Sequence, residues 1–180
     1  MKHFKQYQQF LNEAAPDWDA VDKVKQDPKF QAWYKPSKVR WNASTPMTLF
    51  HGTSRAAASN IKANGFDRNK GRFGGDAGIH FMNNLSHAKP YDKGGMILAF
   101  ARLTNPMDYK KNFEIREKIT MDLLGKTMAD MTRADWDNYT NDIDRQFVKE
   151  MRKQGYDGVF DKSQSEVVVY DSNNIWTIND

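Results

Sequence analysis

The chain has 180 residues, of which 39% are hydrophobic and 13% aromatic, so it suits one folded domain and a disordered chain is excluded. The formal net charge of +4 is a mild excess, which would favour an anionic ligand but is equally typical of a solvated surface. The lack of cysteine excludes disulfides and cysteine-bound zinc, and no apolar run approaches the ~20 residues that span a bilayer, so we expect a soluble, cytoplasmic protein without a membrane partner.

The first 46 residues are predicted to form a helical segment that precedes the main domain. Apolar and aromatic residues recur at helical spacing over residues 2–13, which favours a short amphipathic helix. Asp17 can cap a second helix that runs towards Trp33. Because proline cannot continue a helix without disturbing it, Pro28 would kink or divide this second helix.

Residues 47–110 are predicted to alternate strand and helix. A first strand over residues 47–50 ends on the His-Gly-Thr tripeptide at 51–53. A helix is expected to begin after Ser54, which can cap its N-terminus, and to stop at Gly65. This part of the chain therefore has a strand that leads through three unusual residues into a helix.

A glycine-rich loop over residues 71–78 connects this helix to a second strand over residues 79–82. The loop lacks the Gly-Lys-Ser/Thr end of a P-loop and is weak as a nucleotide fingerprint. Its basic residues, Arg72 among them, could serve a diphosphate from a mobile flap, or could simply be solvated. Asn84 is expected to open a short helix, and residues 96–103 read as a buried strand.

Residues 111–153 are predicted to be a helical insertion within a domain of residues 47–180. Apolar side chains at intervals of three and four indicate a stripe that faces the core. Closing strands are expected at residues 159–160, 166–170 and 175–178. The stripe consists of Trp136, Tyr139, Ile143, Phe147 and Met151.

Three of the predicted strands carry polar residues that could reach a ligand. Gly52 has no side chain, so a ligand could lie directly against its backbone, and His51 could hydrogen-bond a sugar hydroxyl. His80 lies in the second strand. Glu166 opens a valine-rich strand, where its carboxylate could stabilise an oxocarbenium-like state. Each residue alone has a plain alternative, as a buried histidine, a turn glycine or a surface glutamate.

A metal site is another interpretation of the histidines. The spacing of the candidate ligands matches no zinc pattern, so no metal is expected. The ligands of such a site would be His51, His80 and His87, with Asp76 or Asp92.

The three strand motifs, in this order, resemble the ADP-ribosyltransferase superfamily, in particular its histidine-first branch, which includes diphtheria toxin and the poly-ADP-ribose polymerases. Residues 49–53 resemble the first strand of that family, residues 78–81 its second strand, and residues 165–171 the strand with its catalytic glutamate. The resemblance covers about residues 47–178. It implies an α+β fold, with a split, mostly antiparallel β-sheet and flanking helices around an NAD cleft.

The resemblance also implies a role for each matching residue. His51 would hold the adenosine-side ribose, Gly52 would bind the nicotinamide carboxamide through its backbone, and Tyr91 would stack on the nicotinamide. Glu166 would bind the 2′-hydroxyl of the nicotinamide ribose and steer the acceptor. His80 stands where this branch usually has tyrosine, so the catalytic set becomes His51, His80 and Glu166. The further candidates for cofactor binding are Thr53, Phe81 and Arg72.

The reaction implied by the resemblance transfers ADP-ribose from NAD to a host macromolecule and releases nicotinamide. A protein is the favoured acceptor, nucleic acid is the alternative acceptor, and Gln164 could select the acceptor because it lies two residues before Glu166. Ala88 departs from the family, because it replaces a small hydroxyl residue that often helps to bind the carboxamide. The alternative functions are an NAD glycohydrolase or RNA 2′-phosphotransferase with the same fold, and a non-catalytic phage head protein.

Residues 1–13 also resemble the head-targeting propeptides of large tailed phages, which are cut after a glutamate such as Glu13. This resemblance implies an enzyme that is packaged in a virion and injected into the host cytoplasm. The alternative is that these residues form an amphipathic helix of the mature protein.

Overall fold

The computed structural model describes residues 16–67, 78–160, 162–163 and 165–178. Three features predicted from the sequence lie outside the described residues. They are the helix or propeptide over residues 2–13, the part of the glycine-rich loop that holds Arg72 and Asp76, and Gln164.

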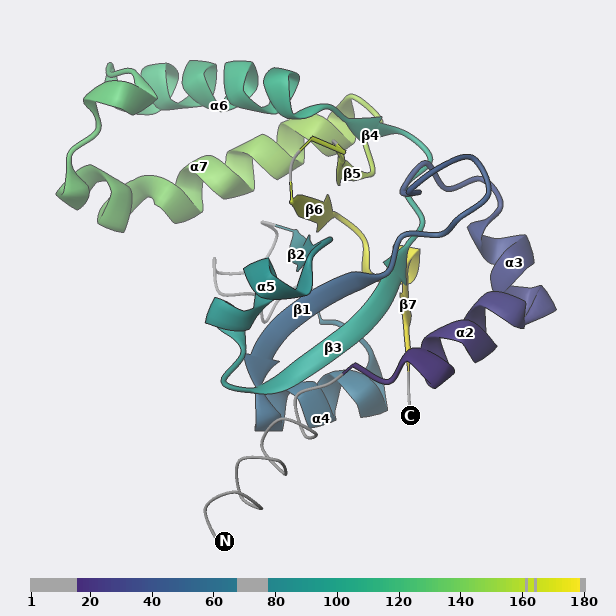
Figure 1. The fold of residues 1–180 in the computed structure, drawn as a ribbon. Helices are drawn as coiled ribbons and strands as arrows, with labels where there is room; N and C mark the ends of the chain where they lie inside the picture. Colours follow the sequence, from purple (N-terminus) through teal and green to yellow (C-terminus); the bar gives the residue numbers. More distant parts are fainter. Residues whose placement is uncertain (1–15, 68–77, 161, 164, 179–180) are drawn as a thin grey trace, which may run out of the picture.

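Helices and short strands alternate along the described chain (Figure 1). The α-helices are α2 (Trp18–Gln26), α3 (Pro28–Tyr34), α4 (Arg55–Asn64), α5 (Leu85–Ala88), α6 (Tyr109–Leu124) and α7 (Arg133–Lys153). Single 3-10 turns are η2 (Lys89–Tyr91), η3 (Met128–Asp130) and η4 (Ser172–Asn174). The strands are β1 (Leu49–Ser54), β2 (Ile79–Met82), β3 (Gly94–Ala101), β4 (Pro106–Met107), β5 (Gly158–Phe160), β6 (Glu166–Val169) and β7 (Ile175–Thr177).

The strands form one sheet in the order β4-β5-β6-β2-β1-β3-β7. Neighbouring strands are antiparallel except for the β4–β5 pair, which is parallel. The β1–β3 pairing runs along the whole of β1, whereas β1 and β2 are paired only where Phe50 lies opposite Met82. The sheet is therefore joined at its middle by one short contact, and the predicted α+β fold with a split, mostly antiparallel sheet is confirmed.

Local capping signals set the helix boundaries. The Asp17 side chain accepts a hydrogen bond from the backbone N–H of Ala20 at 2.9 Å, and Pro28 opens α3, so the single predicted helix is divided into two. Ser54 caps α4, and Gly65 ends it with a φ of 78°, a conformation that favours glycine. These predicted boundaries are confirmed.

The first strand is longer than predicted. It begins at Leu49 and runs through the His-Gly-Thr tripeptide to Ser54, which lies opposite Gly94 of β3. The predicted end at Phe50 was wrong, because a glycine inside a strand looks like a turn signal when the partner strand is not known.

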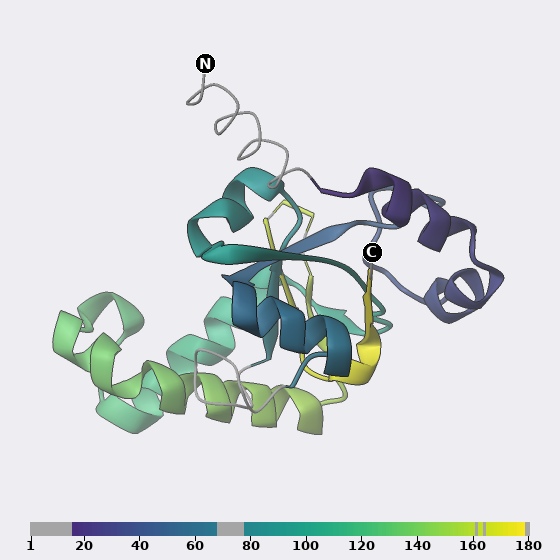
Figure 2. The same ribbon diagram turned by 90° about the horizontal axis from the view of Figure 1, so that it is seen from below.

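One face of the sheet is closed by α4, which lies in front of the strands in Figure 2. Gly95 of β3 makes this close packing feasible, because a Cβ atom there would lie 2.7 Å from the Cβ atom of Ala58 in α4. The largest buried cluster lies on this face. It consists of Val39, Met47, Leu49, Ile79, Phe81, Ala99, Ala101, Leu103, Val167 and Val169.

The opposite face carries two separate clusters. Helices α2 and α3 pack on β3 and β7, where the rings of Phe30 and Phe100 have centroids 4.6 Å apart. Helix α7 packs on β5 and β6, where Phe147 and Val168 belong to one buried cluster. In Figure 1 these two helical groups lie towards opposite ends of the sheet. Between these two groups, α5 and η2 lie against β1 and β2.

Helices α6 and α7 form an antiparallel pair that extends beyond the edge of the sheet (Figure 1). Phe147 and Met151, towards the end of α7, are buried against the sheet, whereas Trp136 and Tyr139 near its start are 36% and 37% exposed. The predicted core-facing stripe is therefore wrong for these two residues, because the sheet does not reach the start of α7. No helix in the described part of the chain is long and apolar enough to span a membrane.

Candidate active site

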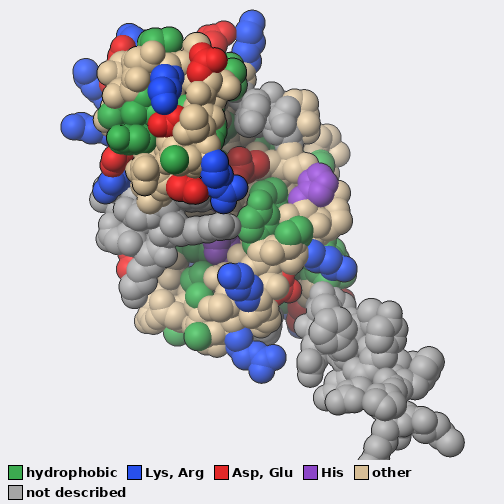
Figure 3. All heavy atoms as spheres, turned by 90° about the vertical axis from the view of Figure 1, so that its left-hand side faces the viewer, with side chains coloured by type: hydrophobic (Ala, Val, Ile, Leu, Met, Phe, Trp, Pro, Cys, Tyr) green, Lys and Arg blue, Asp and Glu red, His purple; other side chains and the backbone are tan. Residues whose placement is uncertain are grey.

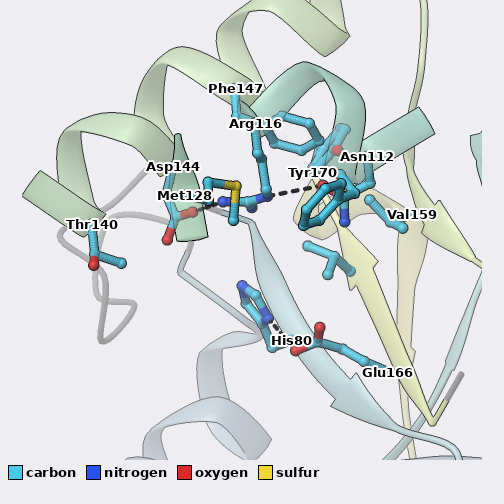
Figure 4. A pocket seen from close by; sticks show the side chains of 12 residues that line it. His80, Asn112, Arg116, Met128, Thr140, Asp144, Phe147, Val159, Glu166 and Tyr170 are labelled. Atoms are coloured by element: carbon cyan, nitrogen blue, oxygen red, sulfur yellow. Dashed lines mark hydrogen bonds and ion pairs between the residues drawn. The ribbon is translucent and has the colours of Figure 1, made fainter. Parts of the chain in front are cut away.

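Two polar side chains meet on the sheet face on which α7 packs. In the β2–β6 ladder, His80 lies opposite Val168 and Met82 lies opposite Glu166, so His80 and Glu166 are diagonal neighbours on one face. Nδ1 of His80 donates a hydrogen bond to Oε1 of Glu166 at 2.8 Å (Figure 4). The predicted catalytic imidazole and carboxylate are therefore in direct contact.

The environment of Glu166 favours its ionised form. The hydrogen bond from His80 lowers the pKa of the Glu166 carboxyl, outweighs the raising effect of partial burial, and is assisted by the charge of Arg116. The side chain is therefore a carboxylate at neutral pH. The pKa of Glu166 is lower in the folded than in the unfolded state. Its contribution to stability is therefore present at pH values above the ordinary pKa of a carboxyl group, and it is lost as the pH falls through the pKa of the folded protein.

His51 is linked to this pair through the backbone. Its Nδ1 donates to the carbonyl oxygen of His80 at 2.8 Å, which fixes the proton on Nδ1 and leaves Nε2 as the acceptor of the neutral ring. The ring contacts Phe66 and Phe81, with centroids 5.1 and 5.6 Å away. Since Phe81 and His80 are neighbours on a strand, the His51 ring lies on the opposite side of β2 from the His80 ring.

Burial of His51 predicts a pH effect on stability. Burial is the main cause that lowers the pKa of His51, so below pH ~6.5 the unfolded chain takes up this proton more readily than the folded protein. The free energy of unfolding should therefore fall as the pH falls from ~6.5 to the folded pKa. His51→Asn keeps a donor for the His80 carbonyl but does not titrate. Urea unfolding at about pH 7 and about pH 5.5 should show that the free energy of unfolding falls less in this variant than in the wild type. An equal fall in both proteins would contradict the assignment of this pH effect to His51.

Gly52 lies against the chain segment that carries Tyr91. A Cβ atom on Gly52 would lie 2.6 Å from the carbonyl oxygen of Ala88, 2.7 Å from the nitrogen of Asp92 and 2.8 Å from the carbonyl carbon of Tyr91. Only glycine fits this contact between β1 and η2. The space that a side chain would take is filled by the protein's own backbone, so on this side of Gly52 the predicted room for a ligand is not present. The side chain of Tyr91 is 48% exposed, so its ring is accessible next to this part of β1.

The other predicted contacts with the cofactor divide into three cases. Phe81 is only 1% exposed and belongs to the large core cluster, so the prediction that it contacts a ligand is not supported; it packs against the His51 ring instead. Thr53 lies half-buried in β1, and its carbonyl accepts a hydrogen bond from the nitrogen of Lys93 at 2.8 Å. Arg72 and the acceptor-selecting Gln164 lie outside the described residues.

The helical pair adds residues to this site that the sequence analysis missed. A cavity of about 250 Å³ lies between α6–α7 and the β2–β6 face, and both His80 and Glu166 line it (Figure 4). From the helices, Arg116 and Asp144 form a partly buried ion pair at its wall. One feature of the sequence could have indicated these residues. Asp144 interrupts the apolar stripe of α7, and an acidic side chain on a buried helix face needs a partner.

On the surface, the end of the helical pair carries acidic, basic and hydrophobic side chains mixed together, above a hollow in the body of the protein (Figure 3). Within the ranges that the structure describes, no three His, Asp or Glu side chains are grouped so as to hold a metal ion. His87 is exposed on α5.

The match to a protein family agrees with this architecture. A family model described as ADP-ribosyltransferase in polyvalent proteins matches residues 42–180, which include the whole sheet. No curated protein matches the chain. A solved structure titled as that of an anti-CRISPR protein is similar over 75% of this chain and 97% of its own, with 17% identity and a TM-score of 0.41. Because the family model covers well over half of the sequence, the chain belongs to the family of ADP-ribosyltransferase domains in polyvalent proteins.

Proposed function

We propose that this protein is an NAD-dependent ADP-ribosyltransferase that transfers ADP-ribose from NAD to a protein of a host cell and releases nicotinamide. The observation that carries this proposal is the contact of 2.8 Å between His80 and Glu166 beside a cavity, in a chain of this family. The pair supplies an ionised carboxylate at a partly desolvated position, which is the group that the reaction needs.

Glu166 supports the reaction through its charge. Cleavage of the bond between the ribose C1′ atom and the nicotinamide nitrogen develops positive charge on the ribose ring. A carboxylate held next to that ring stabilises the transition state more than the ground state, and it can accept a hydrogen bond from the ribose 2′-hydroxyl. The hydrogen bond from His80 fixes the orientation of this carboxylate.

The rest of the proposed NAD site lies at β1 and η2. In this proposal the nicotinamide ring would bind beside the backbone of Gly52 and stack on Tyr91, a residue of the neighbouring η2 that is 48% exposed. The fixed tautomer of His51 leaves Nε2 to accept a hydrogen bond from a ribose hydroxyl. These roles follow from the family resemblance, and they require NAD to reach both sides of β2, because the His51 ring lies on the other side of this strand from His80 and Glu166.

Incubation with NAD labelled in its adenosine half, with and without a bacterial lysate, tests the proposal. We expect nicotinamide release, measured by chromatography, together with label in the protein fraction. Free ADP-ribose without labelled macromolecule would instead identify an NAD glycohydrolase, and label in nucleic acid would change the acceptor. The absence of both nicotinamide release and label would contradict the enzyme assignment and favour a non-catalytic protein.

A further inference from the structure

The cavity between α6–α7 and the sheet, here called the α6–α7 cavity, is separate from the proposed nicotinamide slot. His80 and Glu166 line this cavity, but His51, Gly52 and Tyr91 do not. A cavity that shares only the His80–Glu166 pair with the NAD-binding residues is placed to receive the second substrate of a transfer reaction.

Arg116 is held rigidly at the helical wall of this cavity. Its guanidinium forms an ion pair with Asp144, which is 6% exposed, and its Nε donates to Oδ1 of Asn112 at 2.8 Å. The guanidinium carbon also lies 4.3 Å from the centroid of the Phe147 ring. These contacts fix the guanidinium, but they do not use all of its five N–H donors.

Besides the carboxylates of Glu166 and Asp144, the described part of the cavity wall holds three hydrogen-bond donors that remain unused. Among the described residues, no partner is seen for Nη2 of Arg116, for Nδ2 of Asn112, whose oxygen faces Arg116, or for the hydroxyl of Tyr170, which is 2% exposed. All three residues line the cavity (Figure 4). Donors of this kind, with a guanidinium among them, match the oxygen atoms of an anion.

A cationic acceptor fits the helical wall of this cavity poorly, and the negative charge of Glu166 on the sheet side is assigned to the ribose of NAD. The carboxylate of Asp144 is already paired with Arg116, so it is not available to neutralise a second guanidinium or ammonium group. Such a group would meet the like charge of Arg116 at the same wall. A carboxylate side chain, in contrast, would complete the hydrogen bonding of Arg116, Asn112 and Tyr170.

We propose, on the basis of the proposed function, that the α6–α7 cavity is the acceptor site and that Arg116 selects a carboxylate side chain of an acceptor protein. In the transfer step the bond between C1′ and the nicotinamide nitrogen breaks, and nicotinamide leaves as a neutral molecule with the electron pair. A lone pair of the acceptor carboxylate forms the new C1′–O bond, which yields an ester. The charges of pyridinium and carboxylate cancel, so no proton has to be moved.

The test uses the full-length protein, labelled NAD and two synthetic peptides that differ only in carrying glutamates or arginines. We expect the glutamate peptide to be labelled through a bond that neutral hydroxylamine cleaves, as it does an ester. For Arg116→Gln, the ratio of labelled peptide to released nicotinamide should fall at least about tenfold, because a charged hydrogen bond to the acceptor is lost. Arg133→Gln is the matched control, since Arg133 is 90% exposed on α7 and outside the cavity. In this control the rate of peptide labelling and the rate of nicotinamide release should both stay at the wild-type value.

Tyr170→Phe provides a second variant, because Arg116→Gln leaves Asp144 without its partner and could disturb the fold. The Tyr170 hydroxyl is buried without a partner among the described residues, so its removal should leave thermal stability unchanged or raised. The same ratio of labelled peptide to nicotinamide should fall about threefold to tenfold.

Three results would overturn the inference. One is preferential labelling of the arginine peptide, and another is nicotinamide release without label on either peptide. The third is a parallel fall of both rates in Arg116→Gln with a raised KM for NAD, which would assign the guanidinium to the NAD diphosphate. A wild-type protein that releases no nicotinamide would instead overturn the proposed function itself, together with the acceptor site.

Discussion

Replacement of Glu166 by glutamine should lower the rate of nicotinamide release from NAD by roughly two to three orders of magnitude. Glutamine has the same shape, and its oxygen can still accept the hydrogen bond from His80, so the geometry of the pair should be kept. What is lost is the negative charge that faces the developing positive charge of the ribose. A loss of this size corresponds to about 3–4 kcal/mol of transition-state stabilisation.

The matched control for this variant is Glu150→Gln. Glu150 lies on α7, where its Oε1 accepts a hydrogen bond from Gln154 at 3.0 Å, and glutamine can accept the same bond. Release of nicotinamide should be unchanged in this control, and thermal unfolding at neutral pH should be close to the wild type in both variants. An unreduced rate in Glu166→Gln would count decisively against the role of this carboxylate.

Gly52→Ala should disturb both stability and substrate binding. The added methyl group would meet backbone atoms of Ala88, Tyr91 and Asp92 at 2.6–2.8 Å, and backbone cannot move aside as a side chain does. We expect a loss of about 1–3 kcal/mol in the free energy of unfolding, which is typical of overpacking. Because the segment of Tyr91 must shift away from β1, the KM for NAD should rise as well. Urea unfolding and steady-state kinetics measure the two effects.

Gly155→Ala separates these effects from the general cost of replacing a glycine. Gly155 follows α7 with a φ of 82° and has no atom within 4 Å of the position of a Cβ atom. This control should lose about 1–2 kcal/mol through backbone strain, yet keep the wild-type KM for NAD. A KM that rises equally in both variants would show that the contact of Gly52 with η2 has no special role in binding.

Much of the fold follows from local signals in the sequence. Asp17, Ser54 and Gly65 act through hydrogen bonds and backbone conformations that involve only their immediate neighbours, so the helix ends could be predicted from them. The alternation of side chains along β2 also predicts that Phe81 faces the core. If His80 faces the site, its neighbour must face the core, and the structure shows that arrangement.

The candidate site depends more on contacts that are distant in the sequence. His80 and Glu166 are 86 residues apart and meet only because β2 and β6 pair in one particular register, since a shift by one residue would turn Glu166 to the other face. Arg116 and Asp144 are 28 residues apart and meet because α6 and α7 pack side by side.

By itself, the sequence determined the family, the order of the strand motifs and the identity of the polar residues, because each of these is written in short runs of neighbouring residues. Only the tertiary structure decided that His51 approaches the pair through the His80 carbonyl, that the first part of α7 is exposed, and that the helical pair brings Arg116 to the cavity. The physical reason is that strand register and helix packing are set by burial over the whole domain, whereas propensity and capping act only over about four residues.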